Sequence, residues 1–166
     1  ANGWRVLNVV RSDAAAEAVR AAGGDVVLAD GDDLAERAQD VAAGSRIAMA
    51  IDSVGGQSAR RLMNALDDGG TLVAVGRISG EPMVIDSSNL IASGKTARGF
   101  WLTRGLTSRG AAEVEALYAD LAAAILDGSL STRVEATYPI TRIKEALAHA
   151  HRSGRSGKIL VTPGAD

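Results

Sequence analysis

Arg11 and Ser12 are the residues of this sequence best suited to hold a phosphate group. They follow residues 5–10, a run rich in valine and leucine that is typical of a β-strand. A guanidinium can clamp phosphate with two hydrogen bonds, and the Ser12 hydroxyl can add another. The residues alone also allow a solvated arginine at a strand end, so both interpretations remain open at this point.

Glycines mark two further places where a ligand can approach the backbone. Val54 and Gly55 lie in a turn after the apolar run 47–51, and Val75 and Gly76 end another apolar run at 71–75. Open α/β sheets bind ligands at the carboxyl ends of their strands, which favours both places. A simple turn between strand and helix is the alternative for Gly55.

Phe100 and Trp101 form the one place where two large aromatic residues adjoin, and Leu102 follows them. They close an expected strand, residues 97–102, whose side chains would alternate between faces. A buried core strand and a pocket wall are therefore compatible interpretations.

The ionisable residues predict no metal site. His149 and His151 lie two positions apart on an expected helix, so they do not share a face. The chain has no cysteine, which excludes disulfides and thiolate ligands within it.

Composition excludes several classes of function. The formal net charge is −2, without a basic block, so nothing favours nucleic acid or an anionic membrane as a partner. No apolar run approaches the roughly 20 residues that span a bilayer, and no signal peptide opens the chain. We therefore expect a cytoplasmic protein.

The order of elements predicts an α/β fold. Strands expected at 5–10, 25–28, 47–51 and 71–75 alternate with helices near 13–22, 33–43 and 58–66. This alternation is typical of a parallel sheet with helices on both faces. A strand at 97–102, a long helix at 108–127, a strand at 132–138, a helix at 141–152 and a strand at 158–162 follow.

The second half of the chain carries an ordered series of motifs. They are Arg98-Gly99-Phe100-Trp101-Leu102, Gly128 after the long helix, Tyr138-Pro139-Ile140, Ile143-Lys144-Glu145-Ala146-Leu147 and Gly157-Lys158-Ile159-Leu160-Val161. The series resembles the C-terminal nucleotide-binding half of zinc-independent medium-chain dehydrogenases/reductases. Within them it is most similar to enoyl thioester reductases and quinone oxidoreductases.

This resemblance implies a Rossmann-like doubly wound parallel sheet that lacks its first strand and Gly-rich turn. It divides the chain into a partial dinucleotide-binding domain, residues 1–130, and a return segment, residues 131–166, toward an absent substrate domain. Because a central strand is missing, we expect another segment to fill its place or the flanking strands to close together.

The resemblance also implies an NADPH-dependent oxidoreductase that transfers hydride to an activated C=C bond, as in a 2-enoyl thioester, enone or quinone. It assigns no catalytic residue, because those residues come from the absent N-terminal half, and it implies that this chain, as a fragment of the cofactor domain, is inactive alone. The cofactor contacts that it implies are Arg11, Ser12, Val54, Gly55, Val75, Gly76, Phe100, Trp101, Leu102 and Lys158.

Two predictions concern partners. The resemblance implies a homodimer joined through the edge strand Ala97–Leu102, and the absent N-terminal half as a companion. The alternative function is a non-catalytic, Rossmann-like interaction or dimerisation module.

Overall fold

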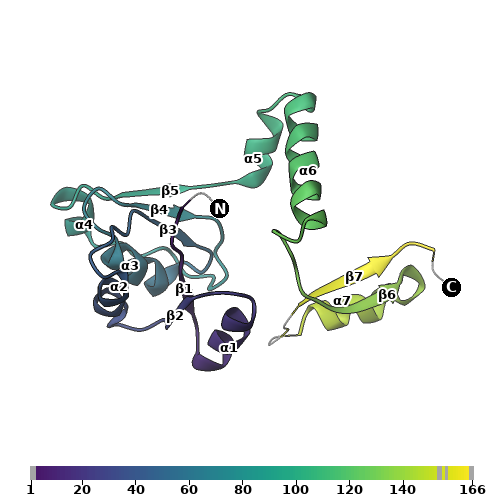
Figure 1. The fold of residues 1–166 in the computed structure, drawn as a ribbon, viewed down its shortest axis with the longest axis horizontal. Coiled ribbons are helices and arrows are strands. Elements are labelled where there is room, and N and C mark those ends of the chain that lie inside the picture. The colour runs from purple at the N-terminus through teal and green to yellow at the C-terminus, as the bar shows by residue number, and fades with distance from the viewer. Residues whose placement is uncertain (1–2, 153–154, 156, 165–166) are drawn as a thin grey trace. The chain divides into compact units, whose positions relative to one another are not determined.

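The computed structural model of the chain describes residues 3–152, 155 and 157–164 (Figure 1). The chain forms two compact units, Ala1–Gly105 and Leu106–Asp166. The predicted division into residues 1–130 and 131–166 follows the family resemblance and stays a prediction. None of the helices in the described ranges is long and apolar enough to cross a membrane.

The first unit alternates strands with helices. Its elements are β1 (Leu7–Val10), α1 (Asp13–Ala21), β2 (Val26–Ala29), α2 (Leu34–Ala42), β3 (Met49–Asp52), α3 (Gly56–Ala65), β4 (Thr71–Ala74), α4 (Ser87–Ile91) and β5 (Thr96–Gly99). Strand β1 pairs with β2, and β3, β4 and β5 form a second sheet in that order. All these pairs are parallel, so the predicted α/β class is confirmed.

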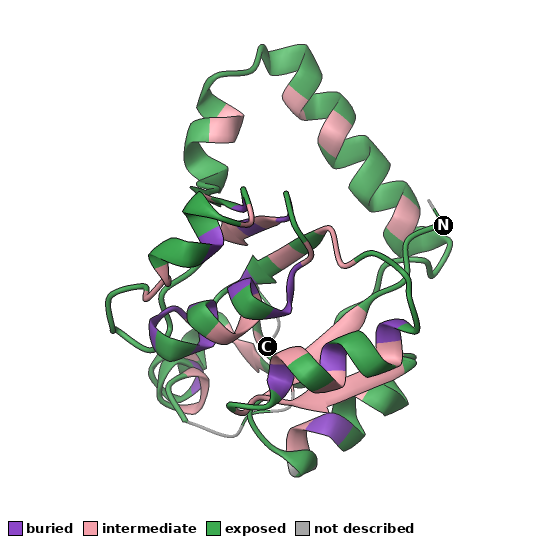
Figure 2. Ribbon diagram, turned by 90° about the vertical axis from the view of Figure 1, so that its left-hand side faces the viewer, coloured by how far each residue is buried: buried purple, intermediate pink, exposed green. Residues whose placement is uncertain are grey.

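The core of the first unit lies between α3 and the sheet β3-β4-β5. Ala59, Met63 and Leu66 recur at helical spacing and pack with Leu72 of β4. Helix α2 packs beside α3 and buries Leu34 completely. Figure 2 shows the buried residues as stripes along these helices.

The strand expected at 97–102 is shorter than predicted. Strand β5 ends at Gly99, and helix α5 (Leu102–Thr107) begins where the sequence predicted continued strand. The Phe100 amide still donates to the Ala74 carbonyl at 2.8 Å. Strand β4 ends at Ala74, so residues beyond Phe100 have no strand beside them to pair with.

The sheet of the first unit is interrupted between β1 and β3. No pairing joins these strands in the part of the chain that the structure describes, and a cavity of about 690 Å³ lies between them. The prediction that the flanking strands close together is therefore wrong, and no described segment of this chain fills the gap. Helix α2 contacts both β2 and α3, and this packing holds the two sheets apart.

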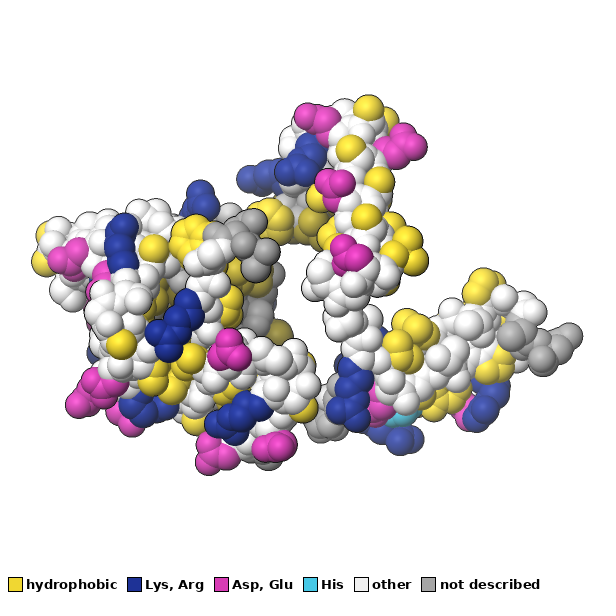
Figure 3. Space-filling view, in the orientation of Figure 1, with side chains coloured by type: hydrophobic (Ala, Val, Ile, Leu, Met, Phe, Trp, Pro, Cys, Tyr) yellow, Lys and Arg dark blue, Asp and Glu magenta, His cyan; other side chains and the backbone are white. Residues whose placement is uncertain are grey.

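The second unit contains α6 (Ala111–Leu126), β6 (Val134–Pro139), the short 3-10 helix η1 (Ile140–Arg142), α7 (Ile143–Ala150) and β7 (Lys158–Thr162). Strands β6 and β7 pair in parallel and α7 packs against both, burying Ala146. The helix expected at 108–127 begins later, with Gly110 as its N-cap, and the Gly110 amide donates to Glu113 at 3.1 Å. No residue of α6 is buried, and apolar side chains lie on its surface (Figure 3).

Candidate functional site

The carboxyl ends of β1, β3 and β4 carry most of the residues that the sequence singled out. Strands β3 and β4 end in register, with Asp52 opposite Ala74. The segments that follow them also bond to each other, since the Ile78 and Ser79 amides donate to the Ser53 and Val54 carbonyls at 3.0 Å each. This edge is where an open α/β sheet binds its ligand.

Asp52 fixes the turn after β3. Its carboxylate is 1% exposed and accepts hydrogen bonds from the amides of Val54, at 2.9 Å, and Gly55, at 3.0 Å. Buried carboxylates need such donors, because their desolvation is otherwise costly. Asp52 is not among the predicted site residues, although an aspartate followed within a few residues by two glycines is typical of a side-chain-stabilised turn.

Gly55 and Gly56 have positive φ angles of 79° and 57°, a region that favours glycine. The loop after β4 lies directly over them. A Cβ atom on Gly56 would come within 3.1 Å of the Glu81 side chain, and Ser79 Oγ donates to the Val54 carbonyl at 2.6 Å. The turn is thus held from both sides.

Gly76 allows the two strand ends to approach closely. A Cβ atom there would lie 2.9 Å from the Ser53 carbonyl oxygen, closer than side chains tolerate. The preceding residue, Val75, donates its amide to the Asp52 carbonyl at 2.8 Å and keeps an exposed side chain. The predicted residues Val54, Gly55, Val75 and Gly76 therefore belong to one contiguous surface.

Arg11 and Ser12 lie at the end of β1, on the other side of the cavity between β1 and β3. Ser12 is the N-cap of α1, since its Oγ accepts a hydrogen bond from the Ala15 amide at 3.4 Å. Arg11 is exposed, and no carboxylate within the described ranges forms an ion pair with it. By contrast, ion pairs with carboxylates are formed by Arg37, Arg60, Arg61 and Arg142.

Phe100, Trp101 and Leu102 follow β5, the strand next to β4, and all three are exposed. The Arg104 guanidinium lies 5.7 Å from the centre of the Trp101 ring, within range of a cation–π contact. These residues share the carboxyl edge of the sheet with Gly76. Lys158 does not join them in the same unit: it begins β7 of the second unit and is exposed.

An ion pair that the sequence did not predict, between Arg61 and Asp30, joins α3 to the end of β2. Arg61 of α3 donates two hydrogen bonds of 2.7 Å to Asp30, which follows β2. The hydrogen bond and charge of Arg61 hold the pKa of Asp30 below its usual value. The two residues lie 31 positions apart, so no local sequence pattern indicates the contact.

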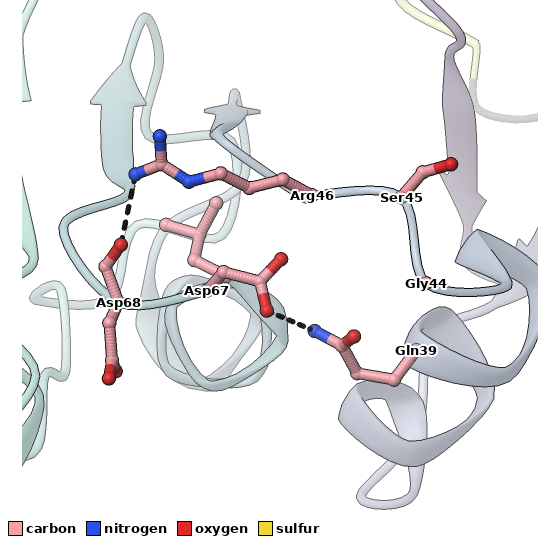
Figure 4. A pocket seen from close by; sticks show the side chains of 7 residues that line it. Gln39, Gly44, Ser45, Arg46, Asp67 and Asp68 are labelled. Atoms are coloured by element: carbon pink, nitrogen blue, oxygen red, sulfur yellow. Dashed lines mark hydrogen bonds between the residues drawn. The ribbon is translucent and has the colours of Figure 1, made fainter.

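A second cavity, of about 570 Å³, lies at the opposite edge of the sheet, near the loops that lead into β3 and β4 (Figure 4). Its polar groups bond to one another: Gln39 donates to Asp67 at 3.2 Å, and Arg46 donates to the Asp68 carbonyl at 2.9 Å. It contains none of the predicted site residues. Across the described residues, no group of three His, Cys, Asp or Glu side chains is arranged to hold a metal ion.

The parallel strands, the alternating helices and this carboxyl edge define an α/β protein of the Rossmann-like class. Residues 1–122 match the family model described as "Zinc-binding dehydrogenase", and the chain belongs to this family. The family resemblance seen in the sequence is thereby confirmed.

Among curated proteins, the chain is 29% identical to the mitochondrial enoyl-[acyl-carrier-protein] reductase of Dictyostelium discoideum, over 97% of this chain and 47% of the relative. It is 27% identical to the enzyme of the same name from Arabidopsis thaliana, over 96% of this chain and 44% of that one. The chain thus spans about half the length of the curated relatives that it matches.

Solved structures give the same fold. A Bacillus thuringiensis protein, whose name proposes an NADPH:quinone reductase, matches with a TM-score of 0.81 and 21% identity, over 95% of this chain and 48% of that one. The complex of Etr1p with NADP and crotonyl-CoA matches with a TM-score of 0.78 and 21% identity, over 94% and 46% of the two chains.

Proposed function

We propose that this chain supplies the cofactor-binding half of an NADPH-dependent reductase that transfers hydride to an activated C=C bond, such as that of a 2-enoyl thioester, an enone or a quinone. The observation that carries the proposal is the contiguous carboxyl edge formed by Val54, Gly55, Val75 and Gly76. These residues lie at the carboxyl ends of β3 and β4, where open α/β sheets bind their ligands. The names of the relatives, which include enoyl reductases and an NADP complex, support the same chemistry.

Arg11 is the proposed determinant of NADPH over NADH. It stands at the end of β1, where an arginine accommodates the 2′-phosphate and a carboxylate would favour the free ribose hydroxyl. Its exposure and the absence of an ion pair among the described residues leave the guanidinium available for phosphate. Ser12 contributes a second polar group beside it.

The nicotinamide half is proposed to lie near Val75, Gly76 and the segment Phe100–Leu102. The reduced cofactor supplies the hydride, and the protein supplies orientation and an apolar wall. Lys158 is proposed as a further contact from the second unit. No residue of this chain is assigned as the proton donor. We therefore propose that a companion polypeptide, similar in length to this chain, completes the active site.

The oligomeric state and the cellular location of the protein are also proposals. The homodimer would form through the outer edge of β5, which has one strand partner, β4, in the described structure. A cytoplasmic location follows from the composition alone, whereas the names of the curated relatives place those enzymes in mitochondria.

The second candidate function is a non-catalytic interaction module. The interrupted sheet between β1 and β3 favours it, since unpaired strand edges are templates for pairing with another chain. Cofactor binding by the isolated chain separates the two functions.

The test is a titration of the chain with NADPH and with NADH, followed by nicotinamide fluorescence. We expect Arg11→Ala to weaken NADPH binding about tenfold, because a charge-assisted bond to phosphate contributes about 1.5–3 kcal/mol, and to leave NADH binding unchanged. Arg20→Ala, on the exposed surface of α1, is the matched control and should change neither. Tighter binding of NADPH than of NADH would support the cofactor-binding half, and equal binding of the two nucleotides would contradict the proposed role of Arg11.

A further inference from the structure

Three polar side chains of the second unit are joined in a row by hydrogen bonds. The Tyr138 hydroxyl lies 3.0 Å from Nδ1 of His149, and Nε2 of the same ring lies 3.0 Å from Oε1 of Glu135. The His149 and Glu135 side chains are 18% and 26% exposed, so water reaches them only in part. A nucleophile, a base within hydrogen-bond distance and a third group that orients the base form the arrangement that activates hydroxyl groups in covalent catalysis.

The hydrogen-bonding capacity of each group assigns the protons in this row. A carboxylate only accepts hydrogen bonds, and the second oxygen of Glu135, Oε2, accepts one from the Gly157 amide at 3.1 Å. We therefore assign the imidazole proton to Nε2, which donates to Oε1 of Glu135. Nδ1 then carries the lone pair, and the Tyr138 hydroxyl donates to it. His149 is thus placed to take the phenolic proton, and Glu135 to stabilise the imidazolium that results.

A β-bulge in β6 brings Glu135 and Tyr138 to the same helix. Residues three apart in a regular strand point to opposite faces of the sheet. The pairing of β6 with β7 shifts its register between Val134 and Ala136, which leaves Glu135 at a bulge. Bulges re-aim side chains and are over-represented next to active sites. Both side chains consequently reach His149 of α7, the helix that lies along β6 and β7 (Figure 1).

The surroundings of the row hold it in place and favour negative charge on the phenolic oxygen. The Arg142 guanidinium lies 5.3 Å from the centre of the Tyr138 ring, within range of a cation–π contact. Glu145 accepts a hydrogen bond of 2.8 Å from Arg142 and offsets part of its charge. A Cβ atom on Gly157 would lie 2.7 Å from the Arg133 carbonyl oxygen, so a residue with a side chain would shift the amide that holds the carboxylate.

We propose that Tyr138 is a nucleophile that accepts an acyl group from an activated ester or thioester. The phenolic oxygen forms a bond to the acyl carbonyl carbon, while the bond from that carbon to the leaving oxygen or sulfur breaks. His149 takes the phenolic proton and passes it to the leaving group, and the product is an O-acyl tyrosine. The step needs no oxidant or reductant. It goes beyond the proposed function, since all its residues belong to the second unit and it uses no nicotinamide cofactor.

The chain contains its own comparison, because it has two tyrosines. Tyr118 of α6 is 57% exposed and Tyr138 is partly buried, so accessibility alone predicts faster reaction at Tyr118. The chain is treated with p-nitrophenyl acetate, and peptide mass spectrometry assigns the acetyl groups to residues over time, which also separates tyrosines from acetylated lysines. We expect acetylation of Tyr138 to be at least about tenfold faster than that of Tyr118, since a general base contributes about 10²–10⁴-fold.

Substitutions separate the effect of the base from that of its surroundings. His149→Gln keeps a polar side chain but removes the base, so acetylation of Tyr138 should fall at least about tenfold while that of Tyr118 stays unchanged. Glu135→Gln keeps a hydrogen-bond acceptor without the charge, and should slow the reaction of Tyr138 severalfold. His151→Gln, at the exposed C-cap of α7, is the matched control and should change neither rate.

Two results would overturn the proposal. One is acetylation of Tyr138 that is no faster than that of Tyr118 in the original chain. The other is a preference for Tyr138 that persists undiminished in both His149→Gln and Glu135→Gln, which would assign the reactivity to the nearby cation of Arg142 instead of to a base. No nucleotide enters these measurements, so failure of the cofactor proposal leaves this test intact.

Discussion

At the scale of single residues, the sequence drew attention to distinctive residue types and missed buried residues whose partners are distant in the chain. Arg11 and the glycines were singled out because their residue types are informative at strand ends, and their contacts with a cofactor stay predictions. Asp52 and the pair of Asp30 and Arg61 were not, because their roles depend on partners that only the fold brings together. These residues matter because they are buried, and burial depends on contacts between residues that are distant in the sequence.

The Asp30–Arg61 pair predicts a specific dependence of stability on pH. The pKa of Asp30 is lowered in the folded chain, chiefly by the hydrogen bond from Arg61. A carboxyl group with a lowered folded pKa stabilises the fold above its unfolded pKa of about 3.9, and this contribution is lost as pH falls through the folded value. Arg61→Gln should therefore lower the free energy of unfolding by about 1–2 kcal/mol at pH 7, toward the lower end for charged hydrogen bonds because both side chains partly reach solvent.

The measurement is urea unfolding of both proteins between pH 7 and pH 3. The difference between them should shrink toward the acid end as Asp30 becomes protonated. Arg60→Gln, which breaks the more exposed pair with Asp86 on the same helix, serves as the control and should cost less at every pH. A difference that stays constant down to pH 3 would show that Arg61 acts through packing instead of through its charge.

At the scale of elements, the alternation of strands and helices in the first unit was predictable, and the ends of elements near the unit boundary were not. Apolar runs of four to six residues between helical segments indicate buried parallel strands with little ambiguity. The exception is the segment after Gly99, where aromatic residues favour strand although β4 has already ended at Ala74. The length of β5 depends on the length of the neighbouring strand β4, and the sequence of β5 alone does not indicate that length.

The contrast between α3 and β3 gives a test of where the core lies. Met63 of α3 is completely buried against Leu72, whereas Met49 of β3 is half exposed beside the cavity. Met63→Ala should lower the free energy of unfolding by about 2–5 kcal/mol, and Met49→Ala by no more than about 0.5 kcal/mol. Equilibrium unfolding in urea compares the same substitution at both positions. Similar costs at the two positions would contradict a core confined to the α3 side of the sheet.

At the scale of the whole molecule, the class of fold was predictable from element order, but the state of the sheet was not. The expected closure of the flanking strands does not occur, because α2 and α3 pack together and set the spacing of the two sheets. Leu34 of α2 and Met63 of α3 are completely buried in this arrangement.

The proposed homodimer depends on pairing through the outer edge of β5. Thr96 and Phe100 donate their amides to β4, so the alternate residues Ala97 and Gly99 turn theirs to the outer edge. Gly99→Pro removes one outward donor, and no atom within 4 Å of its Cβ position opposes the new side chain. We expect light scattering to give twice the mass of one chain for the original sequence and a single-chain mass for Gly99→Pro. Gly99→Ala, which keeps the outward amide, is the matched control, since an equal loss of dimer in both variants would mean that pairing through this donor is not the interface.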